Sequence, residues 1–183
     1  MGTRAYTHSF DLLPRREFAQ LPRGRQKLGG TEFDLRGIVQ LDHRSERADP
    51  LGPFHPLALI RVGQRCRALH FLQATEGELG VDGSTVARWI IHYADGSTRE
   101  WPVIYGEHVL DWWWWTKEEP LEATQATVVW RGRAPVWNKP ATEGVRLFKA
   151  TWTNPQPDVD IAQLEYRIGE TALKPFVVAI TAE

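Results

Sequence analysis

Two runs of strand-forming residues meet at Asp95-Gly96, and this junction restricts the fold more than any other feature of the chain. Asp-Gly between apolar runs is typical of a two-residue type I′ turn, because both central residues of that turn need a positive φ. The pattern therefore predicts an antiparallel hairpin around this turn. The expected register pairs His92 with Arg99, Ile90 with Trp101 and Arg88 with Val103.

The first strand of this hairpin carries apolar side chains on both of its expected faces. Neighbouring residues of a strand point to opposite sides, so Trp89 and Ile91 share one face while Ile90 lies on the other. The pattern predicts a central hairpin that is packed on two sides.

Four consecutive tryptophans, Trp112 to Trp115, follow the hairpin. In an extended segment Trp112 and Trp114 would share one face, and Trp113 and Trp115 the other. One pair can enter the core, and the second needs another layer, a cleft or a ligand. We expect at least one of Trp113 and Trp115 to be exposed and to line a groove. The alternative is that all four are structural, with their indole N–H groups hydrogen-bonded.

Polar residues near the tryptophans complete a predicted ligand-binding set. Glu107 and Asp111 flank His108 just before the run, and a later loop carries Trp137 and Asn138. Exposed indoles stack on the C–H faces of sugar rings, and carboxylates or amides hydrogen-bond to sugar hydroxyls. The simpler interpretation of the two carboxylates is hydrogen bonding to backbone N–H groups of their own loop. The full set is Trp112, Trp113, Trp114, Trp115, Glu107, Asp111, Trp137 and Asn138.

Short alternating or apolar stretches recur along the rest of the chain, and helical periodicity is nearly absent. With the hairpin they make roughly nine expected strands, which is typical of a β-sandwich or barrel. We predict an all-β fold: a single antiparallel β-sandwich of jelly-roll type with little helix. Residues 1–30 are expected to be an irregular segment packed on the sandwich, which spans 31–183. The other expected strands are 33–41, 57–62, 66–74, 124–130, 145–153, 161–168 and 175–181.

Composition excludes several classes of function. The 22 basic and 23 acidic residues nearly cancel, so no strong basic field favours nucleic acid. The single cysteine, Cys66, cannot form an internal disulfide, and no stretch of about 20 apolar residues predicts membrane insertion. Nucleophile-elbow, Walker, HExxH and CxxC motifs are absent. The remaining enzyme hypothesis is a glycosidase-like pair, Glu107 and Asp111, whose separation the sequence does not give.

Metal-binding patterns are weakly represented. His43, His55 and Asp49 share a polar loop, but their spacing matches no common ligand pattern, and ordinary loop residues are the favoured interpretation. Asp158 and Asp160 could offer oxygens to calcium, but hydration at a strand edge is the favoured interpretation of two carboxylates. No metal or cofactor is required by these patterns.

Several segments together resemble β-sandwich domains of the galactose-binding-like type, which occur in multidomain proteins of environmental bacteria. Such domains often accompany glycoside hydrolases or cell-surface modules. The resemblance implies a polysaccharide ligand, a structural calcium ion in some members, and an extracellular or cell-surface location within a larger chain. The matching segments are 21–41, 67–75, 86–113, 148–161 and 176–181.

Three hypotheses about function follow. The first is a non-catalytic carbohydrate-binding module that recognises an oligo- or polysaccharide through exposed tryptophans. The second is a structural or interaction domain whose tryptophans are buried in its core or against a neighbouring domain. The third is a sugar-active enzyme that uses Glu107 and Asp111. We favour the first, because aromatic residues are abundant and catalytic motifs are absent.

Overall fold

Thirteen strands and one short 3-10 helix form the regular structure of the residues that the structure describes. In the computed structural model the described residues are 8–9, 18–43, 55–77, 80–114, 122–133 and 144–183. The elements are β1 (His8–Ser9), η2 (Phe18–Gln20), β2 (Gly24–Leu28), β3 (Thr31–Leu35), β4 (Gly37–Gln40), β5 (Leu57–Gln64), β6 (Ala68–Glu76), β7 (Thr85–Tyr93), β8 (Thr98–Ile104), β9 (Trp113–Trp114), β10 (Ala126–Gly132), β11 (Gly144–Thr153), β12 (Ile161–Ile168) and β13 (Lys174–Ala182).

The strands pair as one long antiparallel ribbon that is folded over itself. The β7–β8 hairpin is the tip of the ribbon, and β6–β11, β5–β12 and β4–β13 follow as nested antiparallel pairs. Successive pairs enter different sheets, which gives the orders β4-β13-β6-β11 and β5-β12-β7-β8. This double-sheet arrangement is a jelly roll, so the predicted all-β antiparallel sandwich is confirmed.

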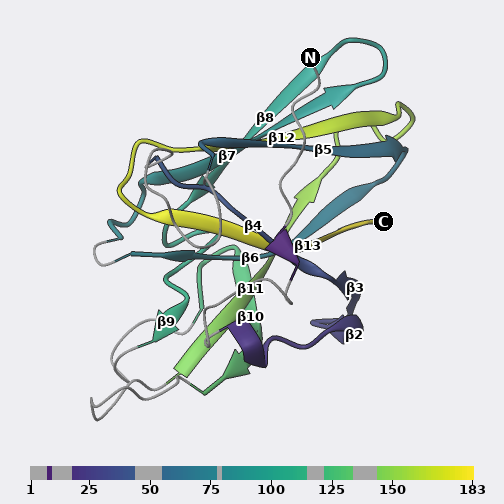
Figure 1. Ribbon diagram of the computed structural model, residues 1–183. Helices are drawn as coiled ribbons and strands as arrows, with labels where there is room; N and C mark the ends of the chain where they lie inside the picture. Colours follow the sequence, from purple (N-terminus) through teal and green to yellow (C-terminus); the bar gives the residue numbers. More distant parts are fainter. Residues whose placement is uncertain (1–7, 10–17, 44–54, 78–79, 115–121, 134–143) are drawn as a thin grey trace.

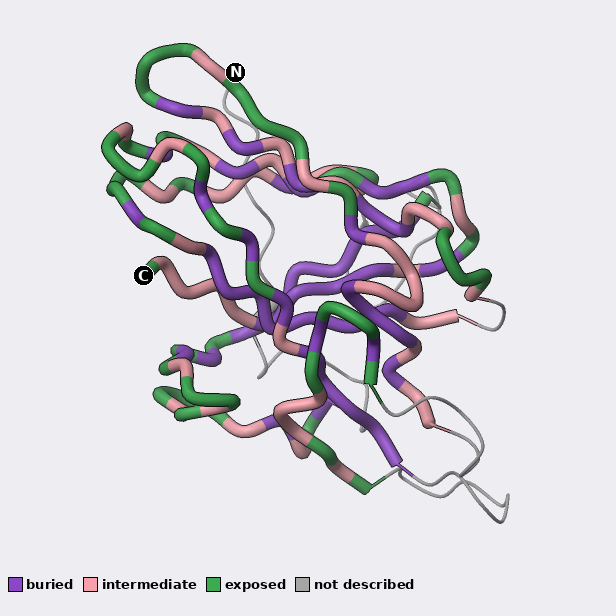
Figure 2. The backbone as a smooth tube through the Cα atoms, turned by 180° about the vertical axis from the view of Figure 1, so that it is seen from behind, coloured by how far each residue is buried: buried purple, intermediate pink, exposed green. Residues whose placement is uncertain are grey.

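The two sheets form the layers of the sandwich. Figure 1 shows β5, β12, β7 and β8 above the larger sheet of β4, β13, β6, β11 and β10. β1 and β10 extend the larger sheet at its two edges, and β2 and β3 form a separate ribbon beside it. Buried backbone lies mainly where the two sheets face each other, while the tip of the β7–β8 hairpin is exposed (Figure 2).

An aromatic cluster fills the space between the sheets. Phe71 of β6 lies 4.7 Å from Trp89 of β7 and 5.1 Å from Trp101 of β8, measured between ring centroids. Trp89 also stacks on Tyr166 of β12, with centroids 4.1 Å apart. Trp89 and Phe71 are fully buried, so contacts between the two sheets form the centre of the core.

A second aromatic cluster covers the other face of the larger sheet. Phe176 of β13 pairs with Ala74, which lies three residues from the inward-pointing Phe71 and therefore on the opposite face. The Phe176 ring contacts Phe18 of η2 at 5.5 Å and Trp112 at 5.6 Å. Part of the outer face of the larger sheet is thus buried as well, and the N-terminal segment supplies some of this cover.

The hairpin loop differs from the predicted two-residue turn. The amide of Gly96 donates to the carbonyl of Tyr93 at 3.1 Å, and the Tyr93 amide donates to the carbonyl of Ser97 at 2.9 Å. The loop therefore has three residues: a β-turn followed by Gly96 at a φ of 87°. The expected positive φ of Gly96 is confirmed. The predicted register is wrong by one residue, since Trp89 faces Trp101 and His92 faces Thr98.

The hairpin is also not central, because β8 is an edge strand of the smaller sheet. Trp89 and Ile91 point into the core, whereas Ile90 on the outer face is only partly buried. On this outer face the Nε of Arg88 lies 2.9 Å from Oε1 of Glu100 on β8. The prediction that the hairpin is packed on two sides is therefore wrong. The ion pair between Arg88 and Glu100 is consistent with an outer face that is in contact with solvent.

Part of the segment expected to be irregular is a strand. Gly24–Leu28 pairs with Thr31–Leu35 across a tight turn at Gly29-Gly30, where both glycines have positive φ. The single strand predicted over 33–41 is divided at Arg36. Its first half pairs with β2, whereas its second half joins β13 in the larger sheet, so the two halves belong to different sheets.

Candidate functional site

Trp112, a predicted ligand-binding residue, belongs to the core. Its side chain is 1% exposed and stacks on Trp130 of β10 with ring centroids 5.7 Å apart. The same indole contacts Phe18 at 5.6 Å. Its N–H has no hydrogen-bond partner among the described residues, so packing alone holds this ring. Contact with a ligand is excluded by this burial, and the prediction for Trp112 is wrong.

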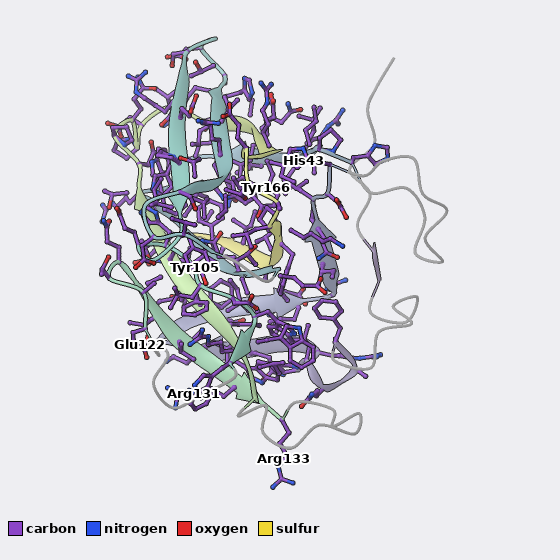
Figure 3. All side chains as sticks on the ribbon, turned by 90° about the vertical axis from the view of Figure 1, so that its left-hand side faces the viewer. His43, Tyr105, Glu122, Arg131, Arg133 and Tyr166 are labelled. Atoms are coloured by element: carbon purple, nitrogen blue, oxygen red, sulfur yellow. The ribbon has the colours of Figure 1, made fainter. Side chains whose placement is uncertain are left out.

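Trp113 and Trp114 form the short strand β9 and are each half-buried. Trp113 pairs with Val145 and Trp114 with Gly144 of β11, so their side chains lie on opposite faces. The guanidinium carbon of Arg131 lies 5.8 Å from the centre of the Trp114 ring, within the range of a cation–π contact. Figure 3 shows Arg131 near Glu122, and its Nη2 is 4.0 Å from Glu122 Oε1. Trp113 is therefore partly exposed. The expectation that Trp113 or Trp115 is exposed and lines a groove stays a prediction, because Trp115 lies outside the described residues.

Both predicted carboxylates accept hydrogen bonds within the protein. Asp111 Oδ1 accepts the amide of Trp113 at 2.7 Å, a local turn that starts β9. The Asp111 carbonyl accepts Nε of the buried Arg146 at 3.0 Å. Glu107 Oε2 accepts Nε2 of Gln125 at 2.8 Å. The simpler interpretation, hydrogen bonding to backbone N–H groups of the same loop, describes Asp111, whereas the partner of Glu107 is the side chain of Gln125 in a different turn. Trp115, Trp137 and Asn138 lie outside the described residues, so their predictions stay predictions.

A shallow depression of about 230 Å³ lies on the outer face of the larger sheet, over β10 and β11. Lys149 and Thr151 lie on this outer face because they pair with Leu72 and His70, the neighbours of the inward-pointing Phe71. Three threonines, one glutamine and one lysine line the depression together with two alanines. The lining residues are Ala123, Thr124, Gln125, Ala126, Thr127, Lys149 and Thr151.

Glu107 reaches this depression through Gln125. The Gln125 amide donates to the Glu107 carbonyl at 2.8 Å, in addition to the side-chain contact. Gln125 also hydrogen-bonds to the His108 side chain, whose Nδ1 accepts the Ile104 amide at 3.0 Å. A backbone N–H can only donate, so the His108 ring must be neutral, with its proton on Nε2. Burial lowers the pKa of His108, which agrees with a neutral ring.

On the opposite side of the depression, Thr151 begins a chain of three polar side chains. Its Oγ1 lies 2.9 Å from Nδ1 of His70, and Nε2 of His70 lies 2.7 Å from Oε2 of Glu183. Thr151 is exposed, whereas His70 is 7% exposed. Both ring nitrogens of the buried His70 therefore have partners.

Lys149 forms the wall of the depression beside the β2–β3 turn. Its ammonium donates to the carbonyl of Gly29 and, at 3.4 Å, to Oγ1 of Thr31. A side chain at position 29 would collide with Val129, so glycine allows this close approach of the turn to β10. The N-terminal ribbon therefore helps to orient the one ammonium group of the depression.

Metal and thiol chemistry find little support in the described part of the chain. No group of three or more His, Cys, Asp or Glu side chains there could hold a metal ion. Asp160, a possible calcium ligand by sequence, lies 3.1 Å from Nε of Arg65. Cys66 is buried, and burial raises the pKa of its thiol, which disfavours the nucleophilic thiolate. Among the described residues, no helix has the length and hydrophobicity to span a membrane.

Sequence reasoning missed most of the depression, although one signal was available. In β11 the polar Lys149 and Thr151 alternate with the buried Phe148 and Ala150, which marks them as outward-facing. No local pattern indicates that the turn at 123–125 lies beside the turn at 105–109. That contact depends on Thr124 and Gln125 donating to backbone carbonyls of the earlier turn.

Comparison of the chain with protein-family models, with curated proteins and with solved structures found no match. The sequence resemblance and the geometry of the described residues are therefore the basis for assigning a function.

Proposed function

We propose that this domain is a non-catalytic carbohydrate-binding module, and that the depression over β10 and β11 holds one sugar ring. The observation that carries the proposal is the chemistry of its lining: three threonines, Gln125 and Lys149 bring hydroxyl, amide and ammonium groups to one depression. Hydroxyls of threonine both donate and accept, as sugar hydroxyls do. The resemblance to galactose-binding-like sandwiches points to the same class of ligand.

The size of the depression fits one unit of a longer glycan. Its volume of about 230 Å³ is below the roughly 300–1,000 Å³ typical of pockets for drug-sized ligands. Trp113 pairs with Val145, four residues before Lys149 in β11 and therefore on the same face. Four residues of a strand span about 13 Å. A glycan that contacts both places needs several sugar units.

A titration series tests this proposal. Cellohexaose, xylohexaose, mannohexaose and polygalacturonate are each titrated into the wild-type protein by calorimetry, and product release is followed by chromatography. We expect one of the four to bind without being cleaved. Thr151→Val should weaken that binding, whereas Thr153→Val, an exposed position on the same face of β11, should not. No binding to any of the four, or equal effects of both substitutions, would contradict the proposal.

Trp113 provides a second measurement on the same glycan. Stacking of a nucleobase on an aromatic side chain is worth roughly 1–3 kcal/mol, and we expect a similar or smaller value for a sugar ring. Trp113→Ala should therefore weaken binding about tenfold, at roughly 1.4 kcal/mol per decade. The matched control is Trp114→Ala, because Trp114 faces the other side of the sheet. An unchanged affinity for Trp113→Ala would limit the contact to the depression.

A second hypothesis is that the domain has a structural or interaction role, and one observation favours it. Trp112 is buried in the core, as that hypothesis requires. Val81, at 67%, is the one exposed large hydrophobic residue in the described ranges, so no broad apolar patch there indicates a partner. The enzyme hypothesis predicts that Glu107→Gln or Asp111→Asn abolishes product release, and the chromatography arm measures this.

A further inference from the structure

The chain Thr151–His70–Glu183 contains one group that can only accept hydrogen bonds. An ionised carboxylate has no proton to donate, so the contact between Glu183 and Nε2 of His70 requires the proton on Nε2. In the neutral ring Nδ1 then has only a lone pair. In that neutral ring the threonine O–H must be the donor in the contact of 2.9 Å between Thr151 Oγ1 and Nδ1.

This order of protons fixes what Thr151 presents to the depression. A hydroxyl has one proton, and His70 takes it, so the Oγ1 lone pairs remain for a ligand. The flanking strand is polar on this face as well: Thr181 of β13 pairs with His70, and its Oγ1 donates to the Glu32 carbonyl at 2.7 Å. Hydroxyls thus flank His70 on both neighbouring strands, and Thr151 is the one that lines the depression.

Lys149 presents the opposite polarity. An ammonium group has three donors and no acceptor, and two of the three donors point to Gly29 and Thr31. Because Lys149 lines the depression, its ammonium is the group there that can only donate to a ligand. Two residues of one strand face therefore offer an acceptor at Thr151 and a donor at Lys149, separated by about 7 Å along β11.

We infer that Glu183 and His70 set the hydrogen-bonding polarity of the depression. It therefore selects a sugar that donates a hydrogen bond to Thr151 and accepts a hydrogen bond from Lys149. Glu183 and His70 are positioning residues that act through Thr151 without contacting the ligand. The inference rests on the proposed function for the identity of the ligand, but the state of the His70 ring is measurable without any ligand.

Nitrogen-15 NMR of the histidine rings tests the proton order directly. The wild-type protein should show Nε2 protonated and Nδ1 bare, and a ring protonated on both nitrogens would contradict the proton order. In Glu183→Lys the new ammonium can only donate, so the proton should move to Nδ1 and Thr151 should become the acceptor. Glu170→Lys makes the same change of charge at an exposed position and should keep the wild-type ring. A wild-type ring protonated on Nδ1, or a ring unchanged in Glu183→Lys, would overturn the inference.

The same variants are then titrated with the four glycans named above. For a glycan that the wild-type protein binds, Glu183→Lys should lower the affinity about tenfold, because Thr151 then offers a donor to a donor. Glu170→Lys should bind like the wild-type protein. Equal binding by all three proteins would overturn the selection of ligands by this polarity. If the wild-type protein binds none of the four, the proposed function fails, and the NMR result still decides the proton order.

Discussion

At the scale of single residues, Asn154 holds together three segments at the end of the sandwich near the hairpin. Its Oδ1 accepts the hydroxyl of Tyr93 at 2.5 Å and the amide of Gln156 at 2.9 Å. Its Nδ2 donates to the carbonyl of Cys66 at 2.8 Å. The side chain is 4% exposed, so water cannot replace these bonds. The connection between β11 and β12 begins at Asn154-Pro155. Its conformation is therefore held by the side-chain amide of Asn154 as well as by the restricted φ of the proline.

Asn154→Ala should lower the free energy of unfolding by about 3 kcal/mol, because it leaves several buried partners without a hydrogen bond. Urea denaturation followed by tryptophan fluorescence measures the change. Gln156→Ala is the control, since it removes the Ser97 contact at the surface but keeps the backbone bond to Asn154. Similar stabilities for both variants would show that the Asn154 network contributes little.

His108 makes stability depend on pH. Burial lowers the pKa of its imidazole below the ordinary 6.5, while the unfolded chain keeps the ordinary value. Between these two pKa values the unfolded state binds the extra proton, so the free energy of unfolding falls as the pH falls. The stabilisation is fully present above pH 6.5 and is lost as the pH drops toward the lowered pKa.

We expect the contribution of His108 to decline with a slope of up to about 1.4 kcal/mol per pH unit just below the unfolded pKa. His108→Asn offers an acceptor oxygen to the Ile104 amide but cannot titrate in this range. Urea denaturation at a series of pH values should show a smaller acid-side loss for this variant. The same pH slope in both proteins would assign the effect to other groups.

At the scale of elements, the β7–β8 hairpin depends on its loop geometry. Asp95 Oδ1 accepts the amide of Ser97 at 2.9 Å and its hydroxyl at 2.7 Å, which closes the loop from inside. These hydrogen bonds to Ser97 hold the pKa of Asp95 below its ordinary value. Gly96 takes the left-handed conformation that a β-branched residue avoids.

Gly96→Val should destabilise the domain by roughly 1 kcal/mol or more. The cause is backbone strain alone, because no atom lies within 4 Å of the place a Cβ would occupy. Gly96→Asn is the control, since asparagine tolerates a positive φ better than other side chains. Thermal denaturation compares the two, and a melting temperature of Gly96→Val equal to that of the asparagine variant would contradict the strain.

At the scale of the whole molecule, the larger sheet needs apolar cover on both faces. The smaller sheet covers one face through Trp89 and its neighbours, and Trp112 with Phe18 and Phe176 covers part of the other. The nested ribbon builds the first contact, because β7 and β6 follow each other in the chain. The second contact brings Phe18 and Trp112, which lie outside the nested strand pairs, against Phe176 of β13. This outer cluster is therefore a separate contribution to stability.

Trp112→Ala should cost about 3–5 kcal/mol of unfolding free energy, the usual loss when a buried aromatic side chain is removed. Trp114→Ala should cost less, since Trp114 is half-buried and its contact with Arg131 is a surface one. Chemical denaturation of both variants measures the difference. If Trp112→Ala were as stable as Trp114→Ala, the outer cluster would not support the fold.

Much of the fold could be predicted from the alternation of apolar and polar residues along each strand. Phe148, Ala150 and Trp152 alternate with the polar Lys149, Thr151 and Thr153, which indicates one buried face in this half of β11. The strand predicted over 161–168 is β12. Gly96 was expected at positive φ, but a two-residue and a three-residue loop both use glycine there. The choice between them, and with it the register, depends on side chains packed across the strands.

The sequence by itself determined the all-β class, the turn position and the outward direction of Lys149 and Thr151, because each follows from a period of two or from the φ of one residue. Only the tertiary structure decided that Trp112 is core, since its partners Phe18 and Phe176 come from distant parts of the chain. The depression likewise needs the turn at 123–125 beside β11. Periodicity shows that a face must be covered, but the three-dimensional path of the chain selects the residues that cover it.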